Sequence, residues 1–380
     1  MPGSSPLGLD PGGFRRAHYG VPYIGLIGLG IPLGEAIPIG EGVSVSTPTE
    51  MANPPGGTGG SRVHTPIKLQ PRRSRPDRVY RFVTTATGLT TFVILGLIGL
   101  FLFIQAWPAF RAMGLRFFTT SAFQTQGKHP NFGVEAALVG SITIALIAIV
   151  VALPVSLASA LFINEYAPRK LLGFFPLKGF LTSLVDLMAA VPSIIYGLWG
   201  FFVLQSHMKG VAKWLSDHLG FIPLFHTTTP IFTSSAFIAG VLVALMIMPI
   251  VTSLSREVFS LTPIGEREGA MALGASRARV IRDVVLPFGK GGIIGAVMLG
   301  LGRALGEAIA VSIIISIVFQ INFHILQAGS NSIAALIAAR FGAGGKLGLA
   351  ALLAAGLVLF AFTLVINMVA SRIVSRTRTS

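Results

Sequence analysis

The 380-residue sequence contains no cysteine and few charged residues. Without cysteine the chain can form no disulfide, thiolate metal site, iron–sulfur cluster or cysteine nucleophile. Charged residues make up only 11% of the sequence, apolar residues make up 52%, and the mean hydropathy is +0.76. Soluble domains carry about 25% charged residues, so this composition predicts a membrane protein.

Motifs for nucleotide or metal chemistry are also missing. A phosphate-binding loop requires a glycine, four residues and then Gly-Lys-Ser/Thr, and the stretches at Gly289-Lys290-Gly291 and Gly345-Lys346-Leu347 lack the hydroxyl and the leading glycine. The seven histidines lie outside the apolar runs, and none belongs to a His-Glu-x-x-His pattern. The sequence therefore predicts no catalytic residue and no metal site. Any ATP hydrolysis has to come from a separate subunit.

Six apolar runs of 19 to 29 residues follow one another along the chain. At about 1.5 Å per residue, each run is long enough to cross a hydrocarbon core of about 30 Å as a helix. The sequence thus predicts an all-α membrane protein with six transmembrane helices. The expected spans are Gly88 to Ala106, Leu138 to Ile163, Phe180 to Leu204, Ser235 to Leu254, Gly291 to Phe319 and Leu347 to Ala370.

The basic residues predict the orientation of these spans. The net charge of +15 would indicate nucleic acid in a soluble chain, but here the lysines and arginines flank the apolar runs. Counted on alternate sides of the spans, 17 lie on one side and 7 on the other. Because positive residues collect in the cytoplasm, both termini are expected there. The longest cytoplasmic loop is then Ser255 to Lys290.

The N-terminal residues 1–75 differ in composition from the rest, residues 76–380. They are rich in glycine, proline, serine and threonine, which predicts a disordered extension. The apolar segment from Val21 to Ile39 contains three prolines and Glu35, which argue against a seventh span or a signal peptide. A translation start at Met51 is an alternative, because a short polar tail would then lead directly into the basic flank of the first span.

The longest cytoplasmic loop carries a spaced motif. Glu268-Gly269-Ala270 is followed after three residues by Gly274 and after nine more by Val284-Val285-Leu286-Pro287. By periodicity alone the loop could be an amphipathic hairpin that rests on its own bundle. The spacing, however, resembles the EAA loop of ABC-transporter permeases, with Gly269 and Val284 in place of alanine and isoleucine. The resemblance implies a coupling loop at 255–290 that docks on an ATPase through Glu268, Gly269, Ala270, Gly274, Leu286 and Pro287.

Three ionisable residues lie inside the predicted spans: Asp186, Arg303 and Glu307. A charge at the bilayer centre costs at least about 2.5 to 3.5 kcal/mol, so such residues usually face a bundle interior or water. In a continuous fifth helix, Arg303 and Glu307 share one face near the midplane. They form either a self-neutralising pair or an anion site, in which the guanidinium binds an oxyanion and Glu307 holds it between substrates. Asp186 is a further counter-ion or a packing contact.

Two further segments make the resemblance specific to one type of permease subunit. Val191-Pro192-Ser193-Ile194-Ile195-Tyr196-Gly197 and Gly300-Leu301-Gly302-Arg303-Ala304-Leu305-Gly306-Glu307 resemble signature segments of the C-type subunit of phosphate-specific ABC permeases, and Asn164-Glu165-Tyr166-Ala167-Pro168 and Ile337-Ala338-Ala339-Arg340-Phe341-Gly342 resemble the same family. The similarity implies a type I ABC permease (MetI-like) fold from about residue 80 onward. It also implies that Arg303, Glu307 and, in a looser match, Asp186 belong to a phosphate pathway.

The family implies a location in a bacterial plasma (inner) membrane and a set of partners, and it leaves alternative functions open. The expected partners are an A-type permease, two ATP-binding subunits that bind ATP and magnesium, and an extracytoplasmic phosphate-binding protein. The chain itself is expected to be a non-catalytic transport subunit with no cofactor. One alternative is a permease for another oxyanion, such as sulfate or molybdate. Another is a proton-coupled transporter that uses Asp186 and Glu307 as a relay.

Overall fold

The computed structural model of the chain describes residues 75–127, 129–168, 176–342 and 345–377. Contacts divide the chain into Met1–Arg72 and Arg73–Ser380, and the described residues belong to the second unit. The predicted extension at 1–75 therefore lies outside the described residues, except for Arg75 at the start of the first helix. The alternative start at Met51 lies outside them as well.

The described chain is mostly helical. Its α-helices are α1 (Arg75–Met113), α2 (Glu135–Leu161), α3 (Leu177–Ala190), α4 (Ser193–Trp199), α5 (Gln205–Leu219), α6 (Ala236–Ser260), α7 (Ile264–Ala272), α8 (Arg277–Val280), α9 (Leu286–Gly306), α10 (Ile309–Ile314), α11 (Ile333–Arg340) and α12 (Gly345–Thr377). Shorter turns are the 3-10 turn η1 (Gly114–Phe118) and the π-helical turns η2 (Phe162–Tyr166), η3 (Gly200–Leu204) and η4 (Ile281–Val285). Strands β1 (Phe123–Gln124) and β2 (Asn131–Phe132) pair antiparallel, with Phe123 opposite Phe132.

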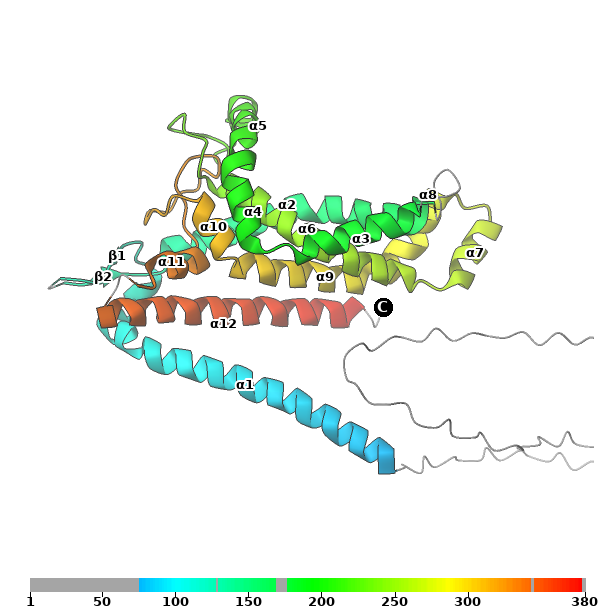
Figure 1. Ribbon diagram of the computed structural model, residues 1–380, viewed down its shortest axis with the longest axis horizontal. Helices are drawn as coiled ribbons and strands as arrows, with labels where there is room; N and C mark the ends of the chain where they lie inside the picture. Colours follow the sequence, from blue (N-terminus) through cyan, green and yellow to red (C-terminus); the bar gives the residue numbers. More distant parts are fainter. Residues whose placement is uncertain (1–74, 128, 169–175, 343–344, 378–380) are drawn as a thin grey trace, which may run out of the picture. The chain divides into compact units, whose positions relative to one another are not determined.

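The core lies where α2 packs along α6 and α6 along α9 (Figure 1). Its buried side chains are mostly alanines and branched aliphatic residues, which allow the helices to approach closely. Two polar contacts join α2 to α6: the Ser156 hydroxyl donates to the Met248 carbonyl at 3.2 Å, and the Thr252 hydroxyl donates to the Ser156 carbonyl at 3.5 Å. These bonds satisfy hydroxyls that have no access to water in a membrane.

The short elements gather at the two ends of the long helices. In Figure 1, α7 and α8 lie at one end, whereas α10, α11 and the β1–β2 hairpin lie at the other. Helix α12 packs against α9 on one side and α1 on the other, and α1 diverges from α12 toward its own N-terminal end. The membrane-length stretch of α1 has 0% of its residues buried, so its surface is free for lipid or for another subunit.

Five helices of the described chain are long and apolar enough to cross a membrane, and one bent pair makes a sixth if it counts as one span. This agrees with the six apolar runs read from the sequence. The third predicted span is wrong in shape, however. The run from Phe180 to Leu204 is not one helix, because α3 ends at Ala190 and the helix that begins at Ser193 turns by 91°.

Proline causes the break in the third span. Val191 has ψ 128°, the extended conformation favoured before a proline, and Pro192 has no N–H to continue the helix. The Tyr196 hydroxyl donates to the carbonyl of Met188 at 3.0 Å and so satisfies one of the acceptors at the end of α3.

The fifth predicted span is also wrong in its limits. A continuous helical segment runs from Arg277 to Gly306, so it begins earlier and ends earlier than the predicted Gly291 to Phe319. Glu307 has ψ 110° and leaves the helix, and the short helix α10 follows. Part of the predicted cytoplasmic loop Ser255 to Lys290 is helical, because α6 extends to Ser260 and the long helical segment begins at Arg277.

Candidate functional site

The two broken helices meet inside the bundle. Helix α4, which follows the break in the third span, packs against α10, which follows the break in the fifth. The contact depends on Gly197, where a Cβ would lie 2.9 Å from the Ala310 Cα. Any larger residue at Gly197 would push the two helices apart. The two signature segments, distant in the sequence, therefore form one structural unit.

Arg303 lies beside this unit, in the last turn of α9. Arg303 is half-buried and shares an open hollow with Ile250, which is near the middle of α6. The Nε atom is buried and has no hydrogen-bond partner, and no ion pair reaches Arg303 among the described residues. A half-buried cation that has no counter-ion within the described chain is open to an anion.

Glu307 does not pair with Arg303, contrary to the expectation from helical spacing. Because the helix ends at Gly306, the two residues do not share a helical face. The Glu307 Oε1 instead accepts the Ala310 backbone N–H at 3.3 Å, at the start of α10. Asp186 lies on the exposed surface of α3, and no hydrogen bond or ion pair joins it to Arg303 or Glu307 within the described ranges.

A groove between α9 and α12 leads from Arg303 toward the end of the bundle that carries α7. It consists of two adjoining hollows of about 480 and 540 Å³ that share Gly295, Met298 and Asn367. The inner hollow contains Arg303, and the outer one extends to Ser371 and Val374.

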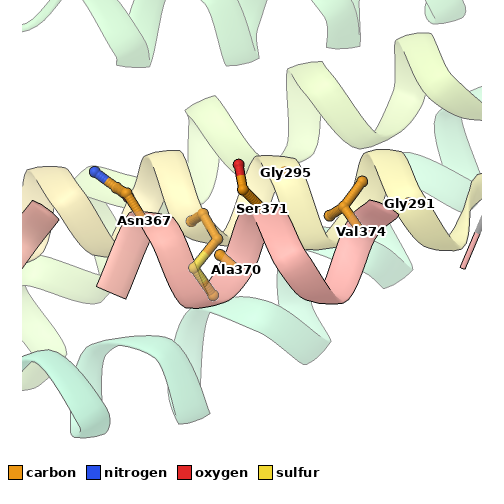
Figure 2. Close-up of a pocket in the computed structure, with 7 residues that line it drawn as sticks. Gly291, Gly295, Asn367, Ala370, Ser371 and Val374 are labelled. Atoms are coloured by element: carbon orange, nitrogen blue, oxygen red, sulfur yellow. The ribbon is translucent and has the colours of Figure 1, made fainter. Parts of the chain in front are cut away.

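The wall of the groove is asymmetric. Asn367, Ser371 and Val374 lie along one side of α12, beside Gly291 and Gly295 of α9 (Figure 2). Glycine on the α9 side keeps the groove open, and an amide and a hydroxyl on the α12 side offer hydrogen bonds. Neither Asn367 nor Ser371 was a candidate in the sequence analysis. An asparagine in an otherwise apolar span is a signal that could have drawn attention to the position.

The candidate coupling loop forms a second site at the end of the bundle. Helix α7 ends at Ala272, and Gly274 follows with φ +85°, a left-handed conformation that favours glycine. The Gly274 N–H donates to the Met271 carbonyl at 2.9 Å and the Ala275 N–H to the Ala270 carbonyl at 3.1 Å, which closes the helix end. A Cβ at Gly274 would meet no atom of the described chain within 4 Å. The turn therefore faces open space.

The motif residues surround this turn. Glu268 and Gly269 are exposed on α7, whereas Ala270 is half-buried. Leu286 is half-buried and Pro287 exposed in the first turn of α9. Exposed apolar side chains adjoin them, with Leu273 91% and Ile264 71% exposed. The end of the bundle therefore presents apolar side chains around the motif.

Sequence comparison agrees with this architecture. A family described as "Binding-protein-dependent transport system inner membrane component" matches residues 171–379. The "Phosphate transport system permease protein PstC" of Mycobacterium leprae is 39% identical over 303 residues, which cover 79% of this chain and 93% of that relative. The chain belongs to the PstC family. A "PstC 2" permease of Mycobacterium tuberculosis is 40% identical to this PstC chain over 241 residues, which cover 63% of the chain and 72% of the relative.

Among solved structures, a "bacterial ABC transporter involved in the import of the acidic polysaccharide alginate" is similar to this PstC chain over 79% of its length and 99% of that chain, with a TM-score of 0.47 and 17% identity. The family match and the helical bundle confirm the predicted fold class, an all-α, multi-pass membrane protein of the ABC permease type. The PstC chain is a permease subunit.

Proposed function

We propose that this PstC chain is the membrane subunit of an ATP-driven phosphate importer and forms half of its translocation pathway. The observation that carries the proposal is Arg303, a guanidinium without a protein counter-ion in the described chain, at the inner end of an open groove. A planar fork of donors suits a tetrahedral oxyanion. The names of the relatives favour phosphate over sulfate or molybdate.

The groove supplies the inner half of the route. In the predicted topology, with both termini in the cytoplasm, the groove runs from Arg303 toward the cytoplasmic face. Asn367 and Ser371 then lie where an anion leaves Arg303, and their neutral donors assist passage without binding the anion as strongly as a second cation would. Glu307 contributes by holding the start of α10. Asp186, which is exposed on α3, stays a candidate residue of the pathway.

ATP hydrolysis belongs to other subunits in this proposal. The chain carries no phosphate-binding loop, so ATP and magnesium bind to two ATPase subunits, and the chain itself is non-catalytic. One ATPase docks at the exposed turn formed by Glu268, Gly269, Ala270 and Gly274, with Leu286 and Pro287 beside it. An A-type permease completes the pathway, and an extracytoplasmic phosphate-binding protein delivers the anion.

Transport by the reconstituted complex tests the proposal. The chain, an A-type permease, the ATPase and the binding protein are placed in proteoliposomes, and uptake of radiolabelled phosphate is measured. We expect uptake that requires ATP, persists when a protonophore collapses the proton gradient, and resists competition by excess sulfate or molybdate. Uptake that survives ATP depletion and fails without the proton gradient would establish a secondary transporter instead. Preferential uptake of sulfate or molybdate would reassign the substrate.

Asn367→Asp tests the groove. We expect this change to lower the rate of phosphate uptake about tenfold, which corresponds to about 1.4 kcal/mol. The new carboxylate either repels the anion or pairs with Arg303, and both effects oppose passage. Asn367→Ser, which keeps a neutral hydrogen-bonding group, is the matched control and should retain most of the uptake. Equal uptake by the aspartate variant would show that the anion does not pass along α12.

A further inference from the structure

A largely buried ion pair joins the candidate coupling helix to the end of α2. The Arg267 Nη1 on α7 donates to the Glu165 Oε1 at 2.8 Å, and the two side chains are only 19% and 17% exposed. The partners are 102 residues apart in the sequence. In contrast, the Arg279–Asp283 pair on the neighbouring helical segment has side chains 75% and 53% exposed. Exposed ion pairs of that kind contribute little to the stability of the fold. Removing one partner of a buried pair, in contrast, is strongly destabilising.

Arg267 also reaches a third helix. Its Nη2 donates to the carbonyl of Phe259, a fully buried residue near the end of α6. The guanidinium therefore holds α7 to α2 with one nitrogen and to α6 with the other. Lysine has a single ammonium and could not hold both acceptors in this fixed geometry.

Glu165 is held in place for this contact. It lies in the π-helical turn η2 that ends α2, and the Asn164 Nδ2 donates to the same Oε1 at 2.8 Å. Lys178, at the start of α3, donates to the Asn164 carbonyl at 3.4 Å. One small polar network thus connects α7 with the ends of α2 and α6 and the beginning of α3.

The rest of α7 is loosely held. None of its residues is fully buried, and within the described chain Arg267 is its only side chain with an ion pair or hydrogen bond to the bundle. Ala270 adds an apolar contact with the small cluster around Phe259 and Val285. Arg267 therefore gives a push on α7 a polar route to α2 and α6, in addition to the contacts of α7 with α8 and η4. Of these, α6 packs along α9, which carries Arg303.

We propose that the Glu165–Arg267 pair transmits the movement of the docked ATPase from α7 to the helices that position Arg303. Both are positioning residues, since neither contacts the anion or the nucleotide. The inference rests on the proposed function, in which α7 docks on the ATPase. It adds the contact by which docking is converted into movement of the pathway.

The experiment compares Glu165→Gln and Arg267→Gln in the complete reconstituted transporter. Phosphate uptake and ATP hydrolysis are measured in the same vesicles, with phosphate-loaded binding protein varied to separate KM from kcat. We expect phosphate uptake per ATP hydrolysed to fall about tenfold in each variant, with the KM for loaded binding protein unchanged. The double variant should be no worse than either single variant, because the two residues act through one contact. The reversed pair, Glu165→Arg with Arg267→Glu, should recover part of the coupling.

Glu257→Gln is the matched control. It makes the same chemical change at an exposed carboxylate near the end of α6 and should leave coupling unchanged. Unchanged coupling in Glu165→Gln and Arg267→Gln, in a complex whose wild type imports phosphate, overturns the inference and leaves the proposed function intact. Absence of ATP-driven uptake by the wild type overturns the proposed function itself.

Assembly of the complex distinguishes a purely structural role of the pair from a role in transmission. If the glutamine variants fail to assemble, Arg267→Lys decides, because it keeps the charge beside Glu165 and loses the second donor. Normal assembly of the lysine variant with low uptake per ATP supports transmission. Poor assembly shows that the pair only stabilises the fold, and full coupling overturns the part of the inference that depends on the second donor to Phe259.

Discussion

Arg303→Gln is expected to abolish phosphate uptake while the complex still inserts and assembles. In this variant the anion loses the charged donors that bind it at the inner end of the groove. Loss of one partner from a charged contact of this kind costs about 2 to 5 kcal/mol, so uptake should fall at least about 30-fold. Uptake is measured in proteoliposomes, and assembly by co-purification of the permease partner and the ATPase.

Assembly should survive because Arg303 has no protein counter-ion in the described chain. Removal of one member of a buried ion pair leaves an uncompensated charge, but here no such charge remains. A neutral glutamine should even be easier to insert into the membrane than an arginine. Loss of assembly in Arg303→Gln would therefore show that the guanidinium has a structural role.

Two further variants sharpen this test. Arg303→Lys keeps the positive charge but loses the planar fork, so we expect partial uptake with a raised KM. Arg111→Gln is the control, because Arg111 lies over the Trp107 ring at 5.3 Å near the end of α1, away from the groove. Normal uptake by Arg303→Gln would refute the pathway role of Arg303.

The sequence predicted the membrane class and most of the spans because hydropathy depends on composition, and a run of 20 apolar residues has few other stable states. It did not predict the two breaks. A hydropathy average does not register one extended residue such as Val191 or Glu307, although Pro192 was a local signal for the first break. The prediction that Arg303 and Glu307 share one helical face was therefore wrong, since the helix ends between them.

The sequence also did not predict the contacts across the bundle. Spacing along one helix says which residues share a face, but the Glu165–Arg267 pair joins residues 102 apart, and only the packing of α2 against α6 brings them together. The groove is a similar case, because Asn367 becomes a candidate only when α12 is placed beside α9. The loop motif, in contrast, could be recognised in the sequence because its residues are close together. Gly274 also has a local reason to be glycine, namely its positive φ.

Gly274→Val is expected to uncouple ATP hydrolysis from phosphate uptake, with phosphate imported per ATP falling at least about tenfold. Two causes act together. A side chain is placed on a turn that docks on the ATPase, and a β-branched residue is forced to a positive φ, which costs about 1 to 3 kcal/mol. Phosphate uptake and ATP hydrolysis are measured together in proteoliposomes, and assembly is checked by co-purification.

Smaller replacements separate the two causes. Asparagine tolerates φ +85° better than alanine does, but its side chain is larger. If docking requires a surface without a side chain, Gly274→Asn should uncouple more than Gly274→Ala. If only the turn conformation matters, the order should reverse. The space around Gly274 is open within the described chain, so no described residue accounts for a steric effect at this position. Normal coupling in all three variants would place the ATPase contact elsewhere on the permease.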